Sequence, residues 1–343
     1  MQKVTLGRSG MTVAKIGFGG IPIQRLSESQ STEVIRRAVE LGIDWFDTAN
    51  CYSDSEVKIG KGIRGFRRES LKIFSKSTAR EAKEFLSHVK LSLERMGLEY
   101  IDLYQFHAVS TIEDWHKIAG EGLLDAAIDL KSQGLIRYIG ASSHRLDAIL
   151  EVMDHSAIEV VQYPFNFIET DALEILKKCE EKNTGFIAMK PFGGGMLDDA
   201  SACVRFLMQY EGAAADPGFE KIAEIEEVVG LVEEAFPLSQ GDLASINRLK
   251  ELLGDCFCRR CGYCTPCEQS IDIVALMAIE SIVKRVPLDK LLSGVFGKAA
   301  KTIDNCTQCG QCESRCPYGL SIRKRIRFGA ELLARMESEQ KSC

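Results

Sequence analysis

Along residues 13–219, strand-like apolar runs alternate with segments whose apolar residues have the period of a helix. Short runs rich in β-branched and aromatic residues are each followed by a segment in which apolar residues recur three or four positions apart. The weakest run, at residues 212–219, consists largely of alanine and glycine, which are poor strand formers. The runs predict strands at residues 13–19, 44–49, 71–76, 100–107, 136–142, 160–166, 185–191 and 212–219.

The segments between these runs predict helices, most clearly at residues 31–41, 81–96, 123–133 and 171–182. Strand–helix units repeated about every 30 residues favour parallel strands joined by right-handed crossovers. Closing these units into an α/β fold of the (β/α)8 TIM-barrel type is the simplest arrangement. An open, doubly wound sheet is the alternative.

Strand-like runs stop after the polar stretch at residues 237–245. Beyond it, segments with helical periodicity surround two groups of closely spaced cysteines, at residues 246–254, 273–285 and 322–336. We therefore predict two domains. Residues 1–240 form the barrel, and residues 241–343 form a small, mostly α-helical, ferredoxin-like metal domain.

The composition narrows the class of protein. The 343 residues are 45% hydrophobic and 27% charged, which leaves room for a barrel of this type and a smaller domain. A formal net charge of -6 gives no support for a nucleic-acid partner. No uncharged apolar run approaches the roughly 18 residues that a membrane span needs, and the start lacks the apolar core of a signal peptide. We expect a cytosolic protein that does not insert into a membrane.

The cysteines are concentrated near the end of the chain. Nine of the 13 lie between Cys256 and Cys316, a grouping that in a reducing compartment indicates metal binding rather than disulfides. The later run has the spacing C-x2-C-x2-C-x3-C-P, which is the signature of bacterial 4Fe-4S ferredoxins. Its members are Cys306, Cys309, Cys312 and Cys316.

The earlier run, from Cys258 to Cys267, is one residue shorter before its last cysteine. In two-cluster ferredoxins the fourth cysteine of a run ligates the other cluster. This pattern predicts two 4Fe-4S clusters, one bound by Cys258, Cys261, Cys264 and Cys316, the other by Cys306, Cys309, Cys312 and Cys267. A single cluster is the alternative, because the earlier run is irregular. Cys256 is then a spare thiol or an alternative ligand. Structural zinc is the alternative metal, although triple runs leave surplus thiols around an ion that takes four ligands.

Polar residues at the carboxyl ends of barrel strands are the first candidates for catalysis, because the loops on that side form the active site. Asp47 and Tyr52 follow the second predicted strand, Lys76 ends the third and His107 ends the fourth. This set suits carbonyl reduction. A phenol can protonate the substrate oxygen, a nearby ammonium favours the phenolate, a carboxylate holds the ammonium, and a neutral imidazole donates a further hydrogen bond.

Three segments carry a family resemblance: FDTANCYSDSE (46–56), FSKST (74–78) and LYQFHAV (103–109). In order and spacing they resemble the Asp, Tyr, Lys and His segments of the aldo-keto reductase family. The resemblance covers about residues 1–235 and includes VTLGRSGMTVAKIGFGG (4–20), similar to the family's amino-terminal hairpin and first strand. It implies NADP or NAD bound in the barrel mouth and a small-molecule carbonyl or alcohol substrate.

The resemblance also implies cofactor contacts at Ser142, Ser143, Gln162, Gly193, Gly194, Gly218 and Lys221. The first three would hold the carboxamide, and the others lie in two loops that would hold the phosphates. Two departures leave the choice of nucleotide open. Met189 stands where the family commonly has an aromatic residue, and Lys221 is the one cation among several glutamates where a 2′-phosphate would bind.

The cysteine segments CRRCGYCTPCEQSIDI (258–273) and CTQCGQCESRCPYGLSI (306–322) resemble those of an aldo-keto reductase subset with an appended ferredoxin-like domain. Three interpretations stay open. The clusters exchange electrons with a redox protein partner, although hydride carries two electrons and no flavin motif is evident to split them. Alternatively, the clusters hold the domain together, or the barrel is a relic in an electron-transfer or redox-sensing protein. We favour a nicotinamide-dependent oxidoreductase.

Overall fold

The computed structural model describes residues 1–234, 236–254 and 256–342. The chain divides into two compact units, one of residues 1–193 and 197–245, the other of residues 194–196 and 246 onward. Helix α10 (Gln240–Leu253) runs through the point of division between residues 245 and 246. The boundary predicted from the sequence lies earlier, between residues 240 and 241, and stays a prediction.

The first unit contains a sheet of eight parallel strands in which neighbours in sequence are also neighbours in space. The sheet closes on itself, because bridges join Ile16 to Ala215 and Gly19 to Gly218. The predicted barrel is confirmed, and the open doubly wound sheet is excluded. The strands are β3 (Phe18–Gly19), β4 (Trp45–Asp47), β5 (Lys72–Ser77), β6 (Ile101–Phe106), β7 (Ile136–Ser142), β8 (Val160–Pro164), β9 (Gly185–Met189) and β10 (Ala213–Ala215).

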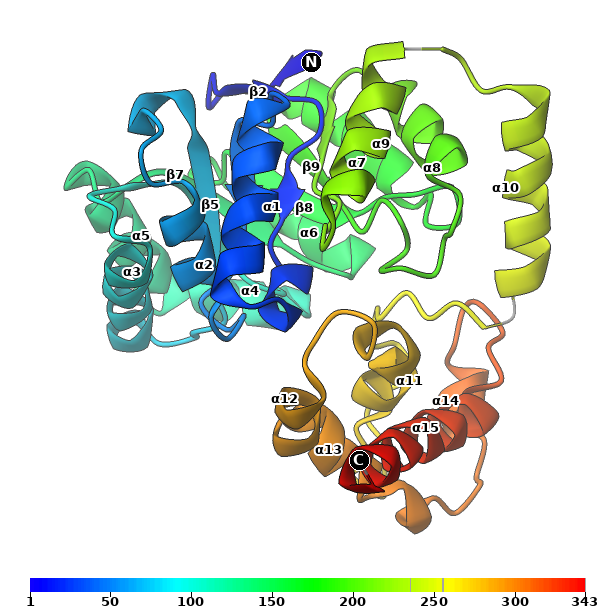
Figure 1. The fold of residues 1–343 in the computed structure, drawn as a ribbon. Helices are drawn as coiled ribbons and strands as arrows, with labels where there is room; N and C mark the ends of the chain where they lie inside the picture. Colours follow the sequence, from blue (N-terminus) through cyan, green and yellow to red (C-terminus); the bar gives the residue numbers. More distant parts are fainter. Residues whose placement is uncertain (235, 255, 343) are drawn as a thin grey trace. The chain divides into compact units, whose positions relative to one another are not determined.

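Helices follow the strands and cover the outside of the barrel (Figure 1). All four predicted helices are present, and the structure adds five further helices within residues 1–234. The helices of this unit are α1 (Glu28–Glu40), α2 (Ser55–Gly62), α3 (Ala82–Met96), α4 (Ile112–Gly120), α5 (Leu123–Ser132), α6 (Leu146–Val152), α7 (Ala172–Lys182), α8 (Ala200–Met208) and α9 (Ile222–Glu234), with 3-10 turns η1 (Pro22–Arg25) and η2 (Arg68–Ser70).

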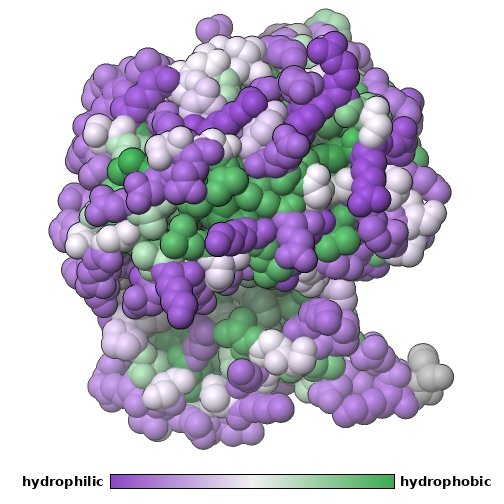
Figure 2. All heavy atoms as spheres, turned by 90° about the vertical axis from the view of Figure 1, so that its left-hand side faces the viewer, coloured by the Kyte–Doolittle hydropathy of each residue, from purple (hydrophilic) through white to green (hydrophobic). Residues whose placement is uncertain are grey.

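Local sequence signals set several of these helix ends. Helix α1 begins with a capping box, in which Ser27 and Gln30 each accept a hydrogen bond from the backbone N–H of the other, over 3.3 Å and 3.0 Å. Helix α3 ends at Gly97, whose φ of 65° is a left-handed conformation that glycine adopts without steric cost. The surface that the helices present is largely hydrophilic, although hydrophobic residues show across the middle of the barrel unit on the face in Figure 2.

The interior of the barrel is filled in layers. Strands β1 (Lys3–Thr5) and β2 (Thr12–Ala14) form an antiparallel hairpin, as the family resemblance implied. Apolar hairpin residues join one buried cluster with inward side chains of the strands: Trp45, Phe74, Leu103, Val160, Ile187 and Ala214. Gly17 makes room for this layer, because a Cβ there would lie 2.1 Å from the Trp45 ring. One end of the barrel is therefore closed by apolar packing.

The second unit is helical, as predicted. Its elements are the carboxyl half of α10, then α11 (Ile273–Ile282), α12 (Leu288–Ser293), α13 (Val295–Ala300), η3 (Ile303–Asn305), α14 (Gln311–Ser314) and α15 (Ile322–Ser342). Helices α11 and α15 pack against each other, and Gly329 allows this approach because a Cβ there would lie 2.5 Å from the Leu276 carbonyl oxygen. Within the described ranges, no helix combines the length and the apolar character that crossing a bilayer requires.

Candidate active site and metal centres

A polar layer lies above the apolar layer inside the barrel. Successive side chains of a strand point to opposite faces, so the residue two positions after each inward apolar residue also points inward. That residue is polar in the strands β4, β5, β6 and β8 and directly after the end of β10. The layer consists of Asp47, Lys76, Gln105, Gln162 and Asp216.

Asp47 and Lys76 form a buried ion pair in this layer. Their side chains are 4% and 2% exposed, and the Lys76 ammonium donates to the Asp47 carboxylate. The same ammonium donates to the Thr48 carbonyl oxygen over 2.8 Å. Buried charges persist when they are paired and hydrogen-bonded, so this arrangement holds the ammonium in one place.

Tyr52 and His107 lie next to this pair. The Lys76 Nζ is 5.7 Å from the centre of the Tyr52 ring, and the Tyr52 and His107 rings meet edge to face with centroids 5.7 Å apart. Burial, followed by the positive charges of Lys76 and Arg80, lowers the pKa of His107 to about 3. The imidazole is therefore neutral near pH 7, with one N–H to donate. The structure thus brings together Asp47, Tyr52, Lys76 and His107.

The backbone beside these residues is strained. Ser53, next to Tyr52, and Ala108, next to His107, have φ values of 34° and 54°, which non-glycine residues rarely adopt. Two contacts hold Ala108 in place: its N–H donates to Ser142 Oγ over 3.0 Å, and its carbonyl oxygen accepts from Arg80 over 3.2 Å. Strain of this kind persists where surrounding contacts over-determine the conformation, and it is concentrated at functional sites.

The three residues expected to hold a carboxamide are all buried. Ser142 Oγ accepts a hydrogen bond from the Ala108 N–H. Ser143 Oγ donates to the Val109 carbonyl oxygen over 2.6 Å and accepts from the Arg145 N–H over 2.9 Å. The Gln162 amide nitrogen donates to Asp216 over 2.7 Å. These side chains already take part in internal hydrogen bonds, which fix their positions.

The two loops expected to hold phosphates differ in character. In the first loop, Gly193 has a φ of 56° and its N–H donates to the Lys190 carbonyl oxygen over 2.9 Å. Gly194, with a φ of 69°, belongs to the second unit. In the other loop, Glu224 accepts hydrogen bonds from the N–H groups of Glu220 and Lys221 over 2.9 Å and 3.1 Å. A carboxylate of the chain thus occupies donors at the start of α9. Gly218 is tightly packed, since a Cβ there would lie 2.6 Å from Pro22.

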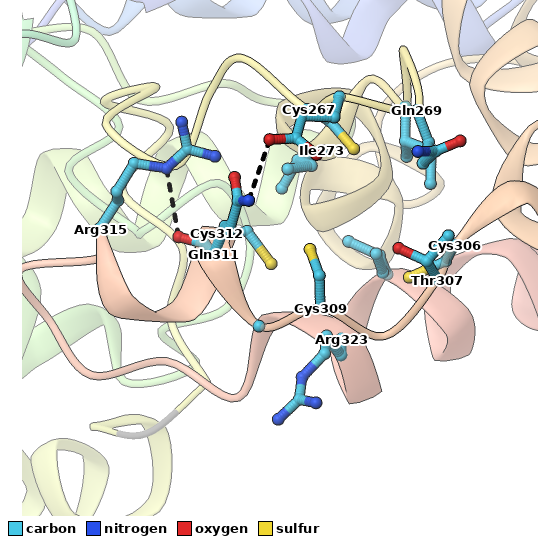
Figure 3. Close-up of a pocket in the computed structure, with 14 residues that line it drawn as sticks. Cys267, Gln269, Ile273, Cys306, Thr307, Cys309, Gln311, Cys312, Arg315 and Arg323 are labelled. Atoms are coloured by element: carbon cyan, nitrogen blue, oxygen red, sulfur yellow. Dashed lines mark hydrogen bonds between the residues drawn. The ribbon is translucent and has the colours of Figure 1, made fainter.

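In the second unit, the cysteine thiols line two cavities. The first is lined by Cys258, Cys261, Cys264 and Cys316, together with Arg259, Arg260 and apolar residues. The second is lined by Cys267, Cys306, Cys309 and Cys312, together with Glu268, Arg315 and Arg323. Figure 3 shows the thiols of the second set arranged around the centre of their cavity. Each cavity therefore takes three cysteines from one run and one from the other.

The thiols of the first cavity influence one another electrostatically. Burial raises the pKa of Cys264 to about 12, with additional repulsion from the thiolates of Cys258, Cys261 and Cys316. Four thiolates in one cavity need a cationic centre to be stable together, and soft thiolate sets of this kind suit iron–sulfur clusters. Cys256 lines neither cavity, and its thiol lies 3.8 Å from the Leu252 carbonyl oxygen.

The barrel fold and its inner layer of Asp47, Lys76, Gln105, Gln162 and Asp216 are typical of an oxidoreductase. Family models identify the chain in the same way. The model described as "Aldo/keto reductase family" matches residues 15–202. The chain belongs to the aldo/keto reductase family. A second model, described as "4Fe-4S dicluster domain", matches residues 257–321, so iron–sulfur clusters are favoured over zinc. The chain is an oxidoreductase with an appended iron–sulfur domain.

Individual relatives match the barrel. An uncharacterized oxidoreductase of Bacillus subtilis is 30% identical over 213 residues, which are 58% of this chain and 67% of the relative. A probable aldo-keto reductase of Glycine max is 30% identical over 216 residues, covering 57% and 61%. The matches thus span about two thirds or less of these relatives. The solved aldo-keto reductase of Bacillus halodurans in its holo form superposes with a TM-score of 0.63 at 24% identity, covering 73% of this chain and 96% of that one.

Several residues of this site were not predicted from the sequence. Asp216 and Gln105 belong to the polar layer, and Arg80 anchors the loop after His107. The Cys51 thiol lies 3.6 Å from Nδ1 of His107. A count of inward positions along each strand could have found Asp216 and Gln105. Arg80 and Cys51 carry no such signal, because their contacts are made by loops.

Proposed function

We propose that this oxidoreductase reduces a small carbonyl compound, or oxidises the corresponding alcohol, with Tyr52 as the proton donor. The observation that carries the proposal is the buried Asp47–Lys76 pair beside Tyr52, with a neutral His107 edge-on to the phenol. A fixed ammonium next to a phenol favours the phenolate and so makes the hydroxyl a better acid.

Each residue has a separate task in this proposal. Tyr52 gives its proton to the substrate oxygen as negative charge develops there. Lys76 stabilises the phenolate that remains, and Asp47 keeps the ammonium charged and in position. The neutral His107 donates a second hydrogen bond to the same oxygen, which stabilises its developing charge.

A nicotinamide dinucleotide would supply the hydride. Its carboxamide would meet the buried polar residues Ser142, Ser143 and Gln162, and its phosphates would meet the loops that contain Gly193, Gly218 and Lys221. Gly194, which the family resemblance also implied, belongs to the second unit and is left out of this proposal. The left-handed φ of 56° at Gly193 supports the placement, because a glycine lets the backbone there approach an anion closely.

We propose NADH rather than NADPH as the preferred form. Glu224 accepts from two backbone N–H groups at the start of α9, and Glu220 pairs with Arg25 at 3.3 Å. A 2′-phosphate placed there would compete with one carboxylate and be repelled by both. A relative from Escherichia coli, 27% identical over 227 residues, carries the name "NADH-specific methylglyoxal reductase", which supports the same preference.

We propose that each cysteine cavity holds one 4Fe-4S cluster through its four thiols. Cys264 and Cys312 are part of the buried core of the second unit, and Cys258, Cys267, Cys306 and Cys316 pack against it. This supports a structural role, in which the clusters stabilise the fold. Cys309 is exposed, and this supports a second candidate role, electron exchange between its cavity and a redox protein partner.

Replacing Tyr52 tests the proposal. With anaerobically purified full-length protein, NADH and a panel of small aldehydes and ketones, Tyr52→Phe should lower turnover by about 10²- to 10⁴-fold, as expected for a lost general acid. Cluster absorbance should not change. Tyr210→Phe is the matched control, because this half-buried tyrosine packs against Phe165 and Phe206 through its ring. Undiminished turnover in Tyr52→Phe would remove this residue from the mechanism.

Titration of the same protein with NADH and NADPH separates the roles of the clusters. Bleaching of the cluster absorbance would support electron flow between barrel and clusters. Binding without bleaching would support the structural role. If neither nucleotide binds, the nicotinamide proposal fails, and the barrel is better explained as a relic.

A further inference from the structure

Asp216 is a second carboxyl group in the polar layer of the barrel. It follows β10 and lies two residues after Ala214, which belongs to the apolar layer below. Its backbone is closely held: the Asp216 N–H donates to the Ala188 carbonyl oxygen over 3.3 Å, and a Cβ on Gly19 would lie 2.6 Å from the Asp216 carbonyl oxygen. The position of the carboxyl group is therefore set by the barrel.

One amide joins the two carboxyl groups. The Gln162 nitrogen donates to Asp216 Oδ2 over 2.7 Å and to Asp47 Oδ2 over 3.3 Å. The other oxygen, Asp216 Oδ1, is buried and has no hydrogen-bond partner within the part of the chain that the structure describes. A carboxylate oxygen without a donor is unfavourable in a buried site, whereas a carboxylic acid can use that oxygen to donate.

The charges around Asp216 lead to the same conclusion. Asp47 faces it from β4 and Lys76 from β5, while Gln105 and Gln162 are neutral, so two carboxyl groups share one ammonium. Burial raises the pKa of Asp216 well above its usual range, Asp47 raises it further, and Lys76 opposes the change. Two adjacent carboxylates cannot both ionise easily, so one of them retains a proton.

We propose that Asp216 is a positioning residue of the active site, protonated near neutral pH, that shares its proton with Asp47. The pair then carries a single negative charge, which matches the single positive charge of Lys76. This role in catalysis rests on the function proposed above. Loss of the shared proton to solvent adds one negative charge near Lys76 and Tyr52. That charge disfavours the Tyr52 phenolate and so weakens the phenol as an acid.

Infrared spectroscopy of the full-length protein without nucleotide tests the proton directly. Wild type should show the carbonyl stretch of a protonated carboxyl group at pH 7, which disappears as the pH rises. Asp216→Asn should lack this band, because an amide keeps the shape and a donor but has no acidic proton. Asp129→Asn, on the exposed face of α5, is the matched control and should retain the band. A wild-type spectrum without any band that Asp216→Asn removes would overturn the proposal.

Thermal stability gives a second readout. An unfolded aspartate ionises near pH 4, whereas Asp216 in the folded state would keep its proton to higher pH. Over that window the folded state binds more protons than the unfolded state, so stability falls as pH rises. The midpoint temperature of barrel unfolding should therefore be higher in Asp216→Asn than in wild type, and this difference should be larger at pH 8 than at pH 5. An equal or reversed margin would contradict proton sharing.

Activity separates this proposal from the proposed function. Carbonyl reduction by wild type should decline at high pH as Asp216 ionises, and Asp216→Asn should keep its rate to higher pH. Asp216→Leu, which removes the donor to Asp47, should lower turnover at every pH, and Asn should rescue it. If the infrared band is present but no carbonyl is reduced, proton sharing stands and the proposed function fails. If wild type is active but its pH profile is unchanged in Asp216→Asn, the positioning role is wrong.

Discussion

The two units of this chain position their functional groups in different ways. In the barrel, Asp47 and Lys76 belong to strands whose backbones are paired on both sides, and packing fixes their side chains. In the second unit, the cysteines of the two runs lie in loops and turns, apart from Cys312 in the four-residue helix α14. The barrel thus builds its site from its own core, whereas the second unit has a small core of which the cysteine side chains are a part.

The second unit is therefore the one that depends on a bound group for its stability. Small domains with little apolar core are commonly stabilised by metals, and the free energy of metal binding then becomes free energy of folding. The barrel should fold without its cofactor. The second unit should need its clusters to reach its folded state.

The largest effect is expected from cluster loss. Cys264→Ser removes a thiol from the first cavity, so the iron content should fall from about eight to about four atoms per chain. The thermal transition of the second unit should weaken or disappear, because Cys264 lies in its core, while the barrel transition persists. Anaerobic iron analysis measures the iron content, and calorimetry measures the two thermal transitions. Cys179→Ser, at a buried barrel cysteine, is the control and should retain all the iron. Full iron in Cys264→Ser would contradict the assignment of this ligand.

Replacing His107 should have a smaller effect than losing a cluster. The barrel holds this side chain in position without a bound cofactor. His107→Leu should lower turnover by about 10²- to 10³-fold, the usual cost of losing one donor to a developing oxyanion, and His107→Gln by less because it keeps a donor. Steady-state kinetics on the full chain measures this. His116→Gln, at an exposed histidine that pairs with Glu151, is the control.

The same histidine should also affect acid stability. Its pKa is about 3 in the folded state, against a usual value near 6.5. The unfolded state therefore binds an extra proton below about pH 6.5, and stability is lost as pH falls from there toward 3. His107→Gln should flatten this part of the stability profile in denaturant unfolding. An unchanged profile would show that His107 is charged or exposed in the folded state.

The smallest effect is expected at the start of α9. Glu224→Gln keeps an acceptor for the two backbone N–H groups but removes the charge, so affinity for NADPH relative to NADH should rise. A charge at a helix start contributes about 0.3 to 1 kcal/mol, which corresponds to about two- to fivefold in relative affinity. Fluorescence titration with both nucleotides measures it. Glu227→Gln, exposed on the same helix, should not change the ratio. A fall in NADPH affinity would contradict the proposed preference.

The sequence predicted the elements that repeat and missed the contacts that depend on tertiary structure. The barrel strands carry strong periodic signals, and even the weak run at residues 212–219 contains a strand, although it is only Ala213–Ala215. Asp47 and Lys76 could be found because they end strands with clear patterns. Asp216 was missed because the alanines of β10 give only a weak strand signal, so its inward position emerges only from counting along that strand. The hydrogen bonds of Ser143 and Arg80 to loop carbonyl groups could not be read from a linear pattern.

Each cysteine cavity is lined by residues of both cysteine runs, so the two runs cannot be separated. Cys316 completes the wall made by the earlier run, and Cys267 completes the wall made by the later one. Neither run is a self-sufficient module that could be transplanted or deleted separately. A truncation just before Cys306 would open both cavities at once, so this terminal region can be gained or lost only as a whole.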